Sequence, residues 1–271
     1  MIKLNGVPVE VGHFPDGSIL MKPEISAQFS LKFGNHRVIS WQYENDIEFV
    51  AVMYLVKHLQ SLGFKKCILD MPYIPNARQD RVKTKEDVFT LKYFAELINS
   101  LDVSCVRVLD PHSSVSEALI NRIEVCTPEK LIKSVIETIN DPNLLMYYPD
   151  EGAMKRYSGM VEKPYVFGIK DRDWKTGKIN GVNVAGITDK VEGRNILIVD
   201  DICSKGGTFY HGAKKLKELG ANKIYLFVSH CENSIHDGAL LKTDLIEKIF
   251  TTNSILTKGH EKIEVMNYDK Y

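Results

Sequence analysis

The sequence lacks the features that mark membrane-bound, secreted or nucleic-acid-binding proteins. It has no apolar run near the roughly 18 residues that span a bilayer. Its first residues, MIKLNGVPVEVGHFPDG, lack the basic and apolar regions of a signal peptide. Lys plus Arg and Asp plus Glu number 35 each, so net charge favours neither nucleic acid nor an acidic membrane. We therefore expect no nucleic-acid partner and no membrane partner.

The sequence also lacks the cysteine spacing of a metal site or a disulfide framework. It contains five cysteines, an odd number, and no C-x-x-C pair. Several of them lie in apolar runs, which is typical of buried free thiols. These observations favour a reducing compartment, and we expect a cytoplasmic protein.

Short apolar runs rich in β-branched residues alternate with helical stretches along most of the chain. This alternation predicts an α/β fold with mainly parallel sheets covered by helices on both faces. The strand-like runs are 37–42, 66–73, 105–112, 144–150, 165–171, 195–201 and 223–230, and the helical stretches are 46–62, 88–101, 115–120, 128–139 and 207–219.

Several of these strand-like runs end in polar or acidic residues. Ligands of open α/β sheets bind at the carboxyl ends of the strands. The pattern predicts two α/β halves that divide near Cys126–Pro128, residues 1–127 and 128–271, with the site between them.

One stretch, ILIVDDICSKGGTF at Ile196–Phe209, reads as a strand, a glycine-rich loop and the start of a helix. Backbone N–H groups at a helix N-terminus attract phosphate, and the helix dipole adds to this attraction. Gly206 and Gly207 permit close approach of the backbone, and the Thr208 hydroxyl adds a donor. The spacing is neither that of a P-loop nor G-x-G-x-x-G.

Two aspartates, Asp200 and Asp201, precede this loop and would repel a phosphate placed directly on them. Carboxylates accept hydrogen bonds from sugar hydroxyls, so the whole stretch suits a ribose phosphate. The alternative is a tight turn that carries two surface aspartates.

A second stretch, MPYIPNARQDR at 71–81, ends a strand and continues into a loop with two arginines. Arginine guanidinium groups bind phosphate oxygens in a bidentate manner. The alternative is a solvated, charged turn.

Both stretches resemble motifs of the ribose-phosphate pyrophosphokinases, or phosphoribosyl pyrophosphate (PRPP) synthetases. The resemblance covers most of the chain and extends to HFPDGSI (13–19), CVRVLDPHSS (105–114), YYPDEGA (147–153) and LFVSHCENS (226–234). It implies two phosphoribosyltransferase-type (type I) domains, an N-terminal one that binds ATP and a C-terminal one that binds ribose phosphate.

The resemblance also implies roles for individual residues. Those implied to bind ATP are Arg78, Gln79, Arg81 and His112, with Phe14 and Asp16 in the segment that reaches into a neighbouring subunit of a dimer-based homo-oligomer. Those implied to bind the ribose phosphate are Asp200, Asp201, Ser204, Lys205, Gly206, Gly207 and Thr208.

The implied cofactor is Mg²⁺, held by His112 and Asp150 together with phosphate oxygens and water. Few protein ligands and several waters suit this cation. A histidine at a strand end can instead be purely structural.

The implied reaction moves the β,γ-diphosphate of ATP to the anomeric hydroxyl of a 5-phosphorylated ribose and releases AMP. The family uses a mobile loop with a lysine and an arginine, and GIKDRDWKTGK (168–178) lies at the corresponding place. We assign Lys170 and Arg172 as the catalytic charge stabilisers, although Asp171 interrupts the usual basic triplet. The alternative is a solvated hairpin of mixed charge.

The chain departs from the family pattern beside the phosphate loop. Ser204-Lys205 replaces Asp-Thr, and Ser18 stands where glutamate is common. The added cation suits a plain phosphate monoester, but it also suits the diphosphate of ADP-ribose, the acceptor of some viral relatives that feed NAD⁺ resynthesis.

Two other functions fit the same overall properties. One is a phosphoribosyltransferase that consumes PRPP, against which the A-R-Q-D-R motif and the second α/β half argue. The other is a catalytically silent regulatory homologue. The presence of His112, Asp150, Lys170 and Arg172 argues against it.

Overall fold

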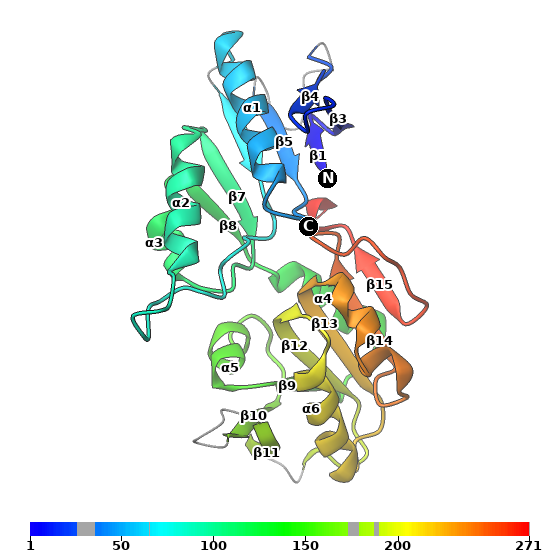
Figure 1. Cartoon of the computed structure of the whole chain (residues 1–271). Helices are drawn as coiled ribbons and strands as arrows, with labels where there is room; N and C mark the ends of the chain where they lie inside the picture. The colour runs from blue at the N-terminus through cyan, green and yellow to red at the C-terminus, as the bar shows by residue number, and fades with distance from the viewer. Residues whose placement is uncertain (26–35, 65, 173–178, 187–189, 271) are drawn as a thin grey trace. The chain divides into compact units, whose positions relative to one another are not determined.

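The structure, a computed structural model, divides the chain into two compact units, Met1–Thr127 and Pro128–Tyr271 (Figure 1). It describes residues 1–25, 36–64, 66–172, 179–186 and 190–270, and it leaves the side chains of 170–183 undescribed. Each unit is an α/β structure built on its own sheet.

The described strands of the N-terminal unit form a six-stranded sheet in the order β2-β1-β5-β6-β7-β8. Strands β5 to β8 are parallel, whereas β1 pairs antiparallel with both β2 and β5. The strands are β1 (Ile2–Leu4), β2 (Val7–Pro8), β5 (Arg37–Trp41), β6 (Cys67–Asp70), β7 (Cys105–Leu109) and β8 (Ile123–Cys126), and the helices are α1 (Glu48–Ser61), α2 (Thr90–Ser100) and α3 (Val115–Leu119).

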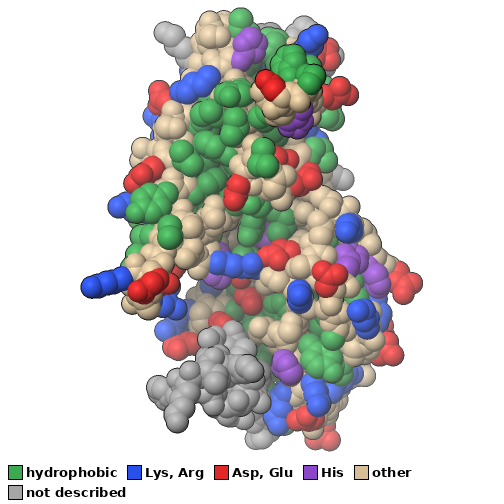
Figure 2. All heavy atoms as spheres, viewed as in Figure 1, with side chains coloured by type: hydrophobic (Ala, Val, Ile, Leu, Met, Phe, Trp, Pro, Cys, Tyr) green, Lys and Arg blue, Asp and Glu red, His purple; other side chains and the backbone are tan. Residues whose placement is uncertain are grey.

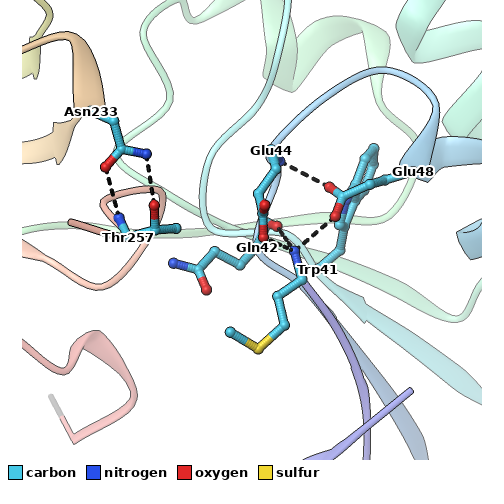
Figure 3. A network of polar contacts seen from close by, with 7 residues as sticks. Trp41, Gln42, Glu44, Glu48, Asn233 and Thr257 are labelled. Atoms are coloured by element: carbon cyan, nitrogen blue, oxygen red, sulfur yellow. Dashed lines mark hydrogen bonds and ion pairs between the residues drawn. The ribbon is translucent and has the colours of Figure 1, made fainter. Parts of the chain in front are cut away.

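The core of this unit is anchored at Trp41, which is fully buried at the end of β5. Its indole Nε1 donates to Glu48 Oε2 at 2.9 Å, and the backbone N–H of Glu44 donates to the same oxygen at 2.9 Å (Figure 3). The ammonium group of Met1 lies 2.8 Å from Glu48 Oε1. One carboxylate thus links the residue before β1, the end of β5 and the start of α1.

A separate two-stranded hairpin, β3 (Val11–His13) and β4 (Ile19–Met21), precedes the main sheet. Its turn carries Phe14, whose side chain is 49% exposed. Hydrophobic side chains also gather on the visible face of the N-terminal unit (Figure 2). An isolated two-stranded hairpin is marginally stable in water, so this segment needs packing against other parts of the protein to stay folded.

The described strands of the C-terminal unit form a seven-stranded sheet in the order β11-β10-β9-β12-β13-β14-β15. All neighbours are parallel except β10 and β11. The strands are β9 (Leu145–Tyr148), β10 (Tyr165–Arg172), β11 (Ile179–Gly186), β12 (Ile196–Cys203), β13 (Ile224–Cys231), β14 (Lys248–Thr252) and β15 (Ile263–Met266), and the helices are α4 (Glu129–Ile139), α5 (Glu151–Tyr157) and α6 (Gly207–Glu218).

The central strand β12 shows why this sheet forms. Ile196 to Val199 are β-branched or leucine, and all four are fully buried. A strand covered on both faces needs such a continuous apolar run. Strand β12 pairs with β9 on one side and with β13 on the other, so the polar residues that follow Val199 lie near the carboxyl ends of both neighbours.

The predicted fold class is confirmed, and several element boundaries differ from expectation. Strands β6 and β7 end at Asp70 and Leu109, three residues before their predicted ends. Strand β12 continues to Cys203, so both aspartates lie within the strand rather than at its end. Strand β10 extends to Arg172, so residues 168–172 of the range expected for the catalytic loop lie in a strand. Of the helices in the described part of the chain, none has the length and apolar character needed to cross a membrane.

Candidate functional site

The phosphate loop of the C-terminal unit connects β12 to α6, and its two glycines have different roles. Gly206 has a φ of +76°, and an added Cβ would lie 2.8 Å from Leu240 Cδ2. This left-handed backbone and the close contact both require glycine. An added Cβ at Gly207 would meet nothing within 4 Å. The N-terminus of α6 therefore faces open space at Gly207, where an anion can approach the backbone N–H groups.

A short segment behind the loop supports Lys205. The Cα of Gly238 packs so closely that an added Cβ would overlap the carbonyl oxygen of Lys205. Gly238 follows a 3₁₀ turn, Asn233–Asp237, and Leu240 contacts the loop from the same segment. The Lys205 side chain itself is exposed. Ser204 and Thr208 are half-buried on either side of this contact.

The two aspartates of β12 have different surroundings, because neighbouring residues of a strand point to opposite faces. Asp201 is 7% exposed, and its Oδ2 lies 3.4 Å from Nη1 of Arg156 on α5. Burial, followed by the charges of Asp201 and Asp150, raises the pKa of Asp200 well above its usual value. The protonated form of Asp200 is therefore more favoured than that of an ordinary aspartate.

Asp150 stands at the N-cap of α5, where its Oδ1 accepts a hydrogen bond from the Ala153 N–H at 3.0 Å. This bond fixes the carboxylate at the end of β9, beside β12. Asp150 follows β9, which pairs with β12, and its charge adds to the raised pKa of Asp200; a divalent cation near these carboxyl groups would neutralise their charge. The donors thus fit Mg²⁺, a hard cation that prefers oxygen ligands.

Lys170 and Arg172 lie on β10 at backbone level, and their side chains are outside the described part of the structure. Lys170 pairs with Val182 of β11, and the register shifts between Asp171 and Arg172. Two residues earlier, an added Cβ at Gly168 would lie 2.6 Å from the carbonyl oxygen of Pro149. This close packing holds β10 against the residue that precedes Asp150.

The predicted ATP-binding loop of the N-terminal unit is anchored at two successive residues. Gln79 Oε1 accepts from the Thr90 hydroxyl at 3.1 Å, at the start of α2. Asp80, which the sequence analysis assigned no role, accepts from Arg81 Nε and from the Ser113 hydroxyl, each at 2.7 Å. The side chains of Arg78 and Arg81 are both exposed.

His112 follows β7 in the same unit, immediately before Ser113, and is exposed. The Asp80–Ser113 hydrogen bond therefore brings the predicted ATP loop next to the segment of the predicted metal ligand. His112 belongs to one unit and Asp150 to the other, so their joint action on a metal stays a prediction. Within the described residues, no cluster of three or more His, Cys, Asp or Glu side chains is arranged to hold a metal ion.

Phe14 and Asp16 lie in the turn of the β3–β4 hairpin. Asp16 Oδ1 accepts from the backbone N–H and the hydroxyl of Ser18, at 2.9 Å and 2.7 Å. These bonds lower the pKa of Asp16 below its usual value. Ser18, which departs from the family pattern, thus shapes the turn that presents Phe14.

Comparison with known proteins bears on the identity of these motifs. Residues 179–270 match the phosphoribosyl synthetase-associated domain family. The ribose-phosphate pyrophosphokinase of Pyrococcus abyssi is 27% identical over 270 residues, which cover 97% of this chain and 90% of the relative. That of Thermococcus kodakarensis is 28% identical over 262 residues, which cover 92% of this chain and 86% of the relative.

The chain is similar over nearly its whole length to ribose-phosphate pyrophosphokinases.

The fold agrees with that of a solved member of the ribose-phosphate pyrophosphokinase family. The phosphoribosylpyrophosphate synthetase of Mycobacterium smegmatis superposes with a TM-score of 0.77 at 18% sequence identity, covering 96% of this chain and 86% of that one. The mixed α/β units with mostly parallel sheets are therefore of the phosphoribosyltransferase type.

Sequence reasoning missed three residues that shape these sites: Asp80, Arg156 and Gly238. Asp80 lies inside the A-R-Q-D-R motif, so its position was visible but its partner was not. Arg156 lies six residues after Asp150, and Gly238 is a glycine outside any motif. Neither of these two gives a signal in the sequence alone.

Proposed function

We propose that the chain is an Mg²⁺-dependent pyrophosphokinase that transfers the β,γ-diphosphate of ATP to the anomeric hydroxyl of a 5-phosphorylated ribose and releases AMP. The observation that carries this proposal is the arrangement around β12. A helix N-terminus open at Gly207 and two carboxylates occur on one strand–loop–helix unit. Relatives over nearly the whole chain are ribose-phosphate pyrophosphokinases.

The residues would divide the work between the two substrates. Arg78, Gln79 and Arg81 bind the nucleotide, and the loop from Ser204 to Thr208 binds the 5-phosphate through backbone N–H groups. Asp200 and Asp201 accept hydrogen bonds from the ribose hydroxyls. His112 and Asp150 would each supply a ligand to Mg²⁺, whose charge would balance that of the phosphate oxygens. Lys170 and Arg172 stabilise the charge that develops as the diphosphate moves.

Two acceptors suit the phosphate loop, ribose 5-phosphate and ADP-ribose. The exposed side chain of Lys205 supports the larger one, because ADP-ribose carries a second phosphate beyond the position of the 5-phosphate, and this exposed lysine can pair with it. With ADP-ribose the product would be ADP-ribose pyrophosphate, an intermediate suited to NAD⁺ resynthesis. With ribose 5-phosphate it would be PRPP, for nucleotide biosynthesis.

The direct test is to incubate the protein with ATP, Mg²⁺ and either acceptor, and to measure AMP by chromatography. AMP formation that depends on acceptor and Mg²⁺ is the expected result. If neither acceptor supports AMP formation, the proposal is wrong and the silent regulatory homologue replaces it. A phosphoribosyltransferase would instead release pyrophosphate from PRPP and a base, without ATP.

Replacing Lys205 with threonine tests the choice of acceptor. If Lys205 binds a diphosphate, Lys205→Thr should lower kcat/KM for ADP-ribose about 10-fold, the value of one charge-assisted hydrogen bond, and change that for ribose 5-phosphate about threefold at most. Steady-state kinetics with both acceptors give the ratio. Lys214→Thr on α6, the helix that follows this loop, is the control. A ratio equal to that of the wild-type protein would exclude a role of Lys205 in acceptor choice.

We also propose a cytoplasmic homo-oligomer. All five cysteines are free thiols, which fits a reducing compartment. Exposed hydrophobic side chains on the N-terminal unit, such as Phe14 and Ile47, suit an interface between copies. Sedimentation equilibrium measures the mass, and a monomer at micromolar concentration would contradict the oligomer.

A further inference from the structure

The Asp80 carboxylate links two loops of the N-terminal unit. Oδ1 accepts from Arg81 Nε at 2.7 Å, and Oδ2 accepts from Arg81 Nη2 at 3.2 Å and from the Ser113 hydroxyl at 2.7 Å. The Asp80 side chain is 11% exposed, whereas that of Arg81 is 69% exposed. The carboxylate is therefore held inside while the arginine extends into solvent.

The hydrogen bonds to Asp80 determine which donors of Arg81 remain available. A guanidinium group has five N–H donors. Asp80 uses the Nε–H and one N–H of Nη2, so both N–H groups of Nη1 and the second of Nη2 stay available to a ligand. This is one complete donor edge, the arrangement that binds two phosphate oxygens at once.

Ser113 is the hydrogen-bond donor to Asp80 in this link. Its Oγ accepts from the Val115 N–H at 3.2 Å, at the start of α3, and donates its single proton to Asp80. The hydroxyl thus donates one hydrogen bond and accepts another, and the residue is 7% exposed. His112 precedes Ser113 directly, so the same bond fixes the backbone that carries the predicted metal ligand.

The link also holds the loop at a second point. Gln79 is bonded to Thr90 at the start of α2, and Asp80 is bonded to Ser113 before α3. Hydrogen bonds from Arg81 and then from Ser113 lower the pKa of Asp80, so the carboxylate is ionised at neutral pH. Two successive residues are anchored to two helices, which leaves the loop little freedom to rearrange.

We propose that Asp80 is a positioning residue that orients Arg81 toward the triphosphate of ATP and, through Ser113, ties the ATP loop to the His112 segment. The inference rests on the proposed function, because it assumes that ATP binds at this loop. Asp80 acts through Arg81 and Ser113, the two residues that donate to its oxygens. Its effect is preorganisation, which lowers the entropy lost on binding.

The first experiment measures Mg·ATP binding by calorimetry without any acceptor. Asp80→Ala should raise the dissociation constant about 20-fold, because Arg81 and Ser113 lose charge-assisted bonds. Ser113→Ala should raise it about fivefold, and Ser113→Thr, which keeps the hydroxyl, should restore it. The double variant Asp80→Ala/Ser113→Ala should bind as Asp80→Ala does, within about twofold, because Ser113 acts through Asp80.

The matched control is Asp87→Ala. Asp87 lies in the same loop and accepts from the backbone N–H groups of Lys83 and Thr84, each at 2.8 Å, so it shapes the loop without reaching Arg81. It should change the dissociation constant about threefold at most. An equal loss in Asp87→Ala and Asp80→Ala would reduce Asp80 to general loop stability and overturn the inference. Additive losses in the double variant would overturn it as well.

The second experiment separates this inference from the proposed function. In the AMP assay, Asp80→Ala should raise the KM for ATP about 20-fold and leave the KM for the acceptor within about twofold. If Mg·ATP binding depends on Asp80 but the wild-type protein forms no AMP, the proposed reaction is wrong and the inference is supported. Wild-type protein that does not bind Mg·ATP would overturn both.

Discussion

Lys170→Ala should lower kcat about 100-fold to 1,000-fold, the loss usually seen when one preorganised electrostatic donor is removed from a transition state. The KM for ATP should stay within about threefold of the wild-type value, because Lys170 is expected to act on charge that develops during transfer. Stopped assays of AMP formation, at saturating ATP and acceptor, measure the loss.

The backbone supports this expectation. Lys170 lies on β10, two residues after Gly168, and Gly168 packs directly on the carbonyl oxygen of Pro149. Pro149 precedes Asp150, so the strand that carries Lys170 is held beside the end of β9. Pairing with Val182 of β11 continues this support at Lys170 itself.

The matched control is Lys133→Ala. Lys133 lies on α4 of the same unit and pairs on the surface with Glu129 at 2.6 Å, so it should leave kcat unchanged. Arg172→Ala should resemble Lys170→Ala, and the double variant should lose less than the product of the two, because both stabilise one charge. Wild-type kcat in Lys170→Ala would remove the lysine from the mechanism.

The strands and helices could be predicted from sequence where the apolar pattern is long. The run Ile196–Val199 predicts a buried strand, and the pattern after Gly206 predicts α6 from Gly207, as observed. The N-terminal strands β1 to β4 have two or three residues each, which is too short for periodicity to indicate a strand. They depend on pairing with distant segments, such as β1 with β5.

The candidate residues were visible in the sequence because each lies in a compact motif, but their supports were not. Asp80 meets Ser113 across 33 residues, and Arg156 meets Asp201 across 45. Such pairs form only when neighbouring strands bring their carboxyl ends together. The end of β10 was predicted to within one residue, but the range 168–178 expected for the catalytic loop overlaps this strand, where pairing with β11 holds its first residues.

Gly238→Ala should raise the KM for the acceptor about 100-fold or more, because a displacement of about 1 Å at a binding site has effects of this size. The new methyl group would overlap the carbonyl oxygen of Lys205, so the phosphate loop must move. The KM for ATP should stay within about threefold, since the ATP-binding residues are predicted in the other unit. Overpacking should also lower the free energy of unfolding by about 1–3 kcal/mol.

The segment behind the loop cannot easily retreat. Asn233, at its start, donates from Nδ2 to the Thr257 hydroxyl at 2.8 Å and accepts from the Thr257 N–H at 3.1 Å (Figure 3). Leu240, at its end, is 1% exposed and packs on Gly206. With both ends of the segment held, the strain of a Cβ at Gly238 falls on Lys205 and its loop.

Two further glycine variants separate displacement of the loop from general instability. Gly159→Ala places a methyl group where nothing lies within 4 Å, so both KM values and the thermal midpoint should be unchanged. Gly207→Ala also meets no protein atom within 4 Å, so the fold should be retained, but the methyl group occupies the space through which the phosphate approaches α6. Its acceptor KM should rise about 10-fold, the loss of one charge-assisted hydrogen bond. A Gly238→Ala protein that folds and binds acceptor as the wild type does would show that this loop does not bind the phosphate.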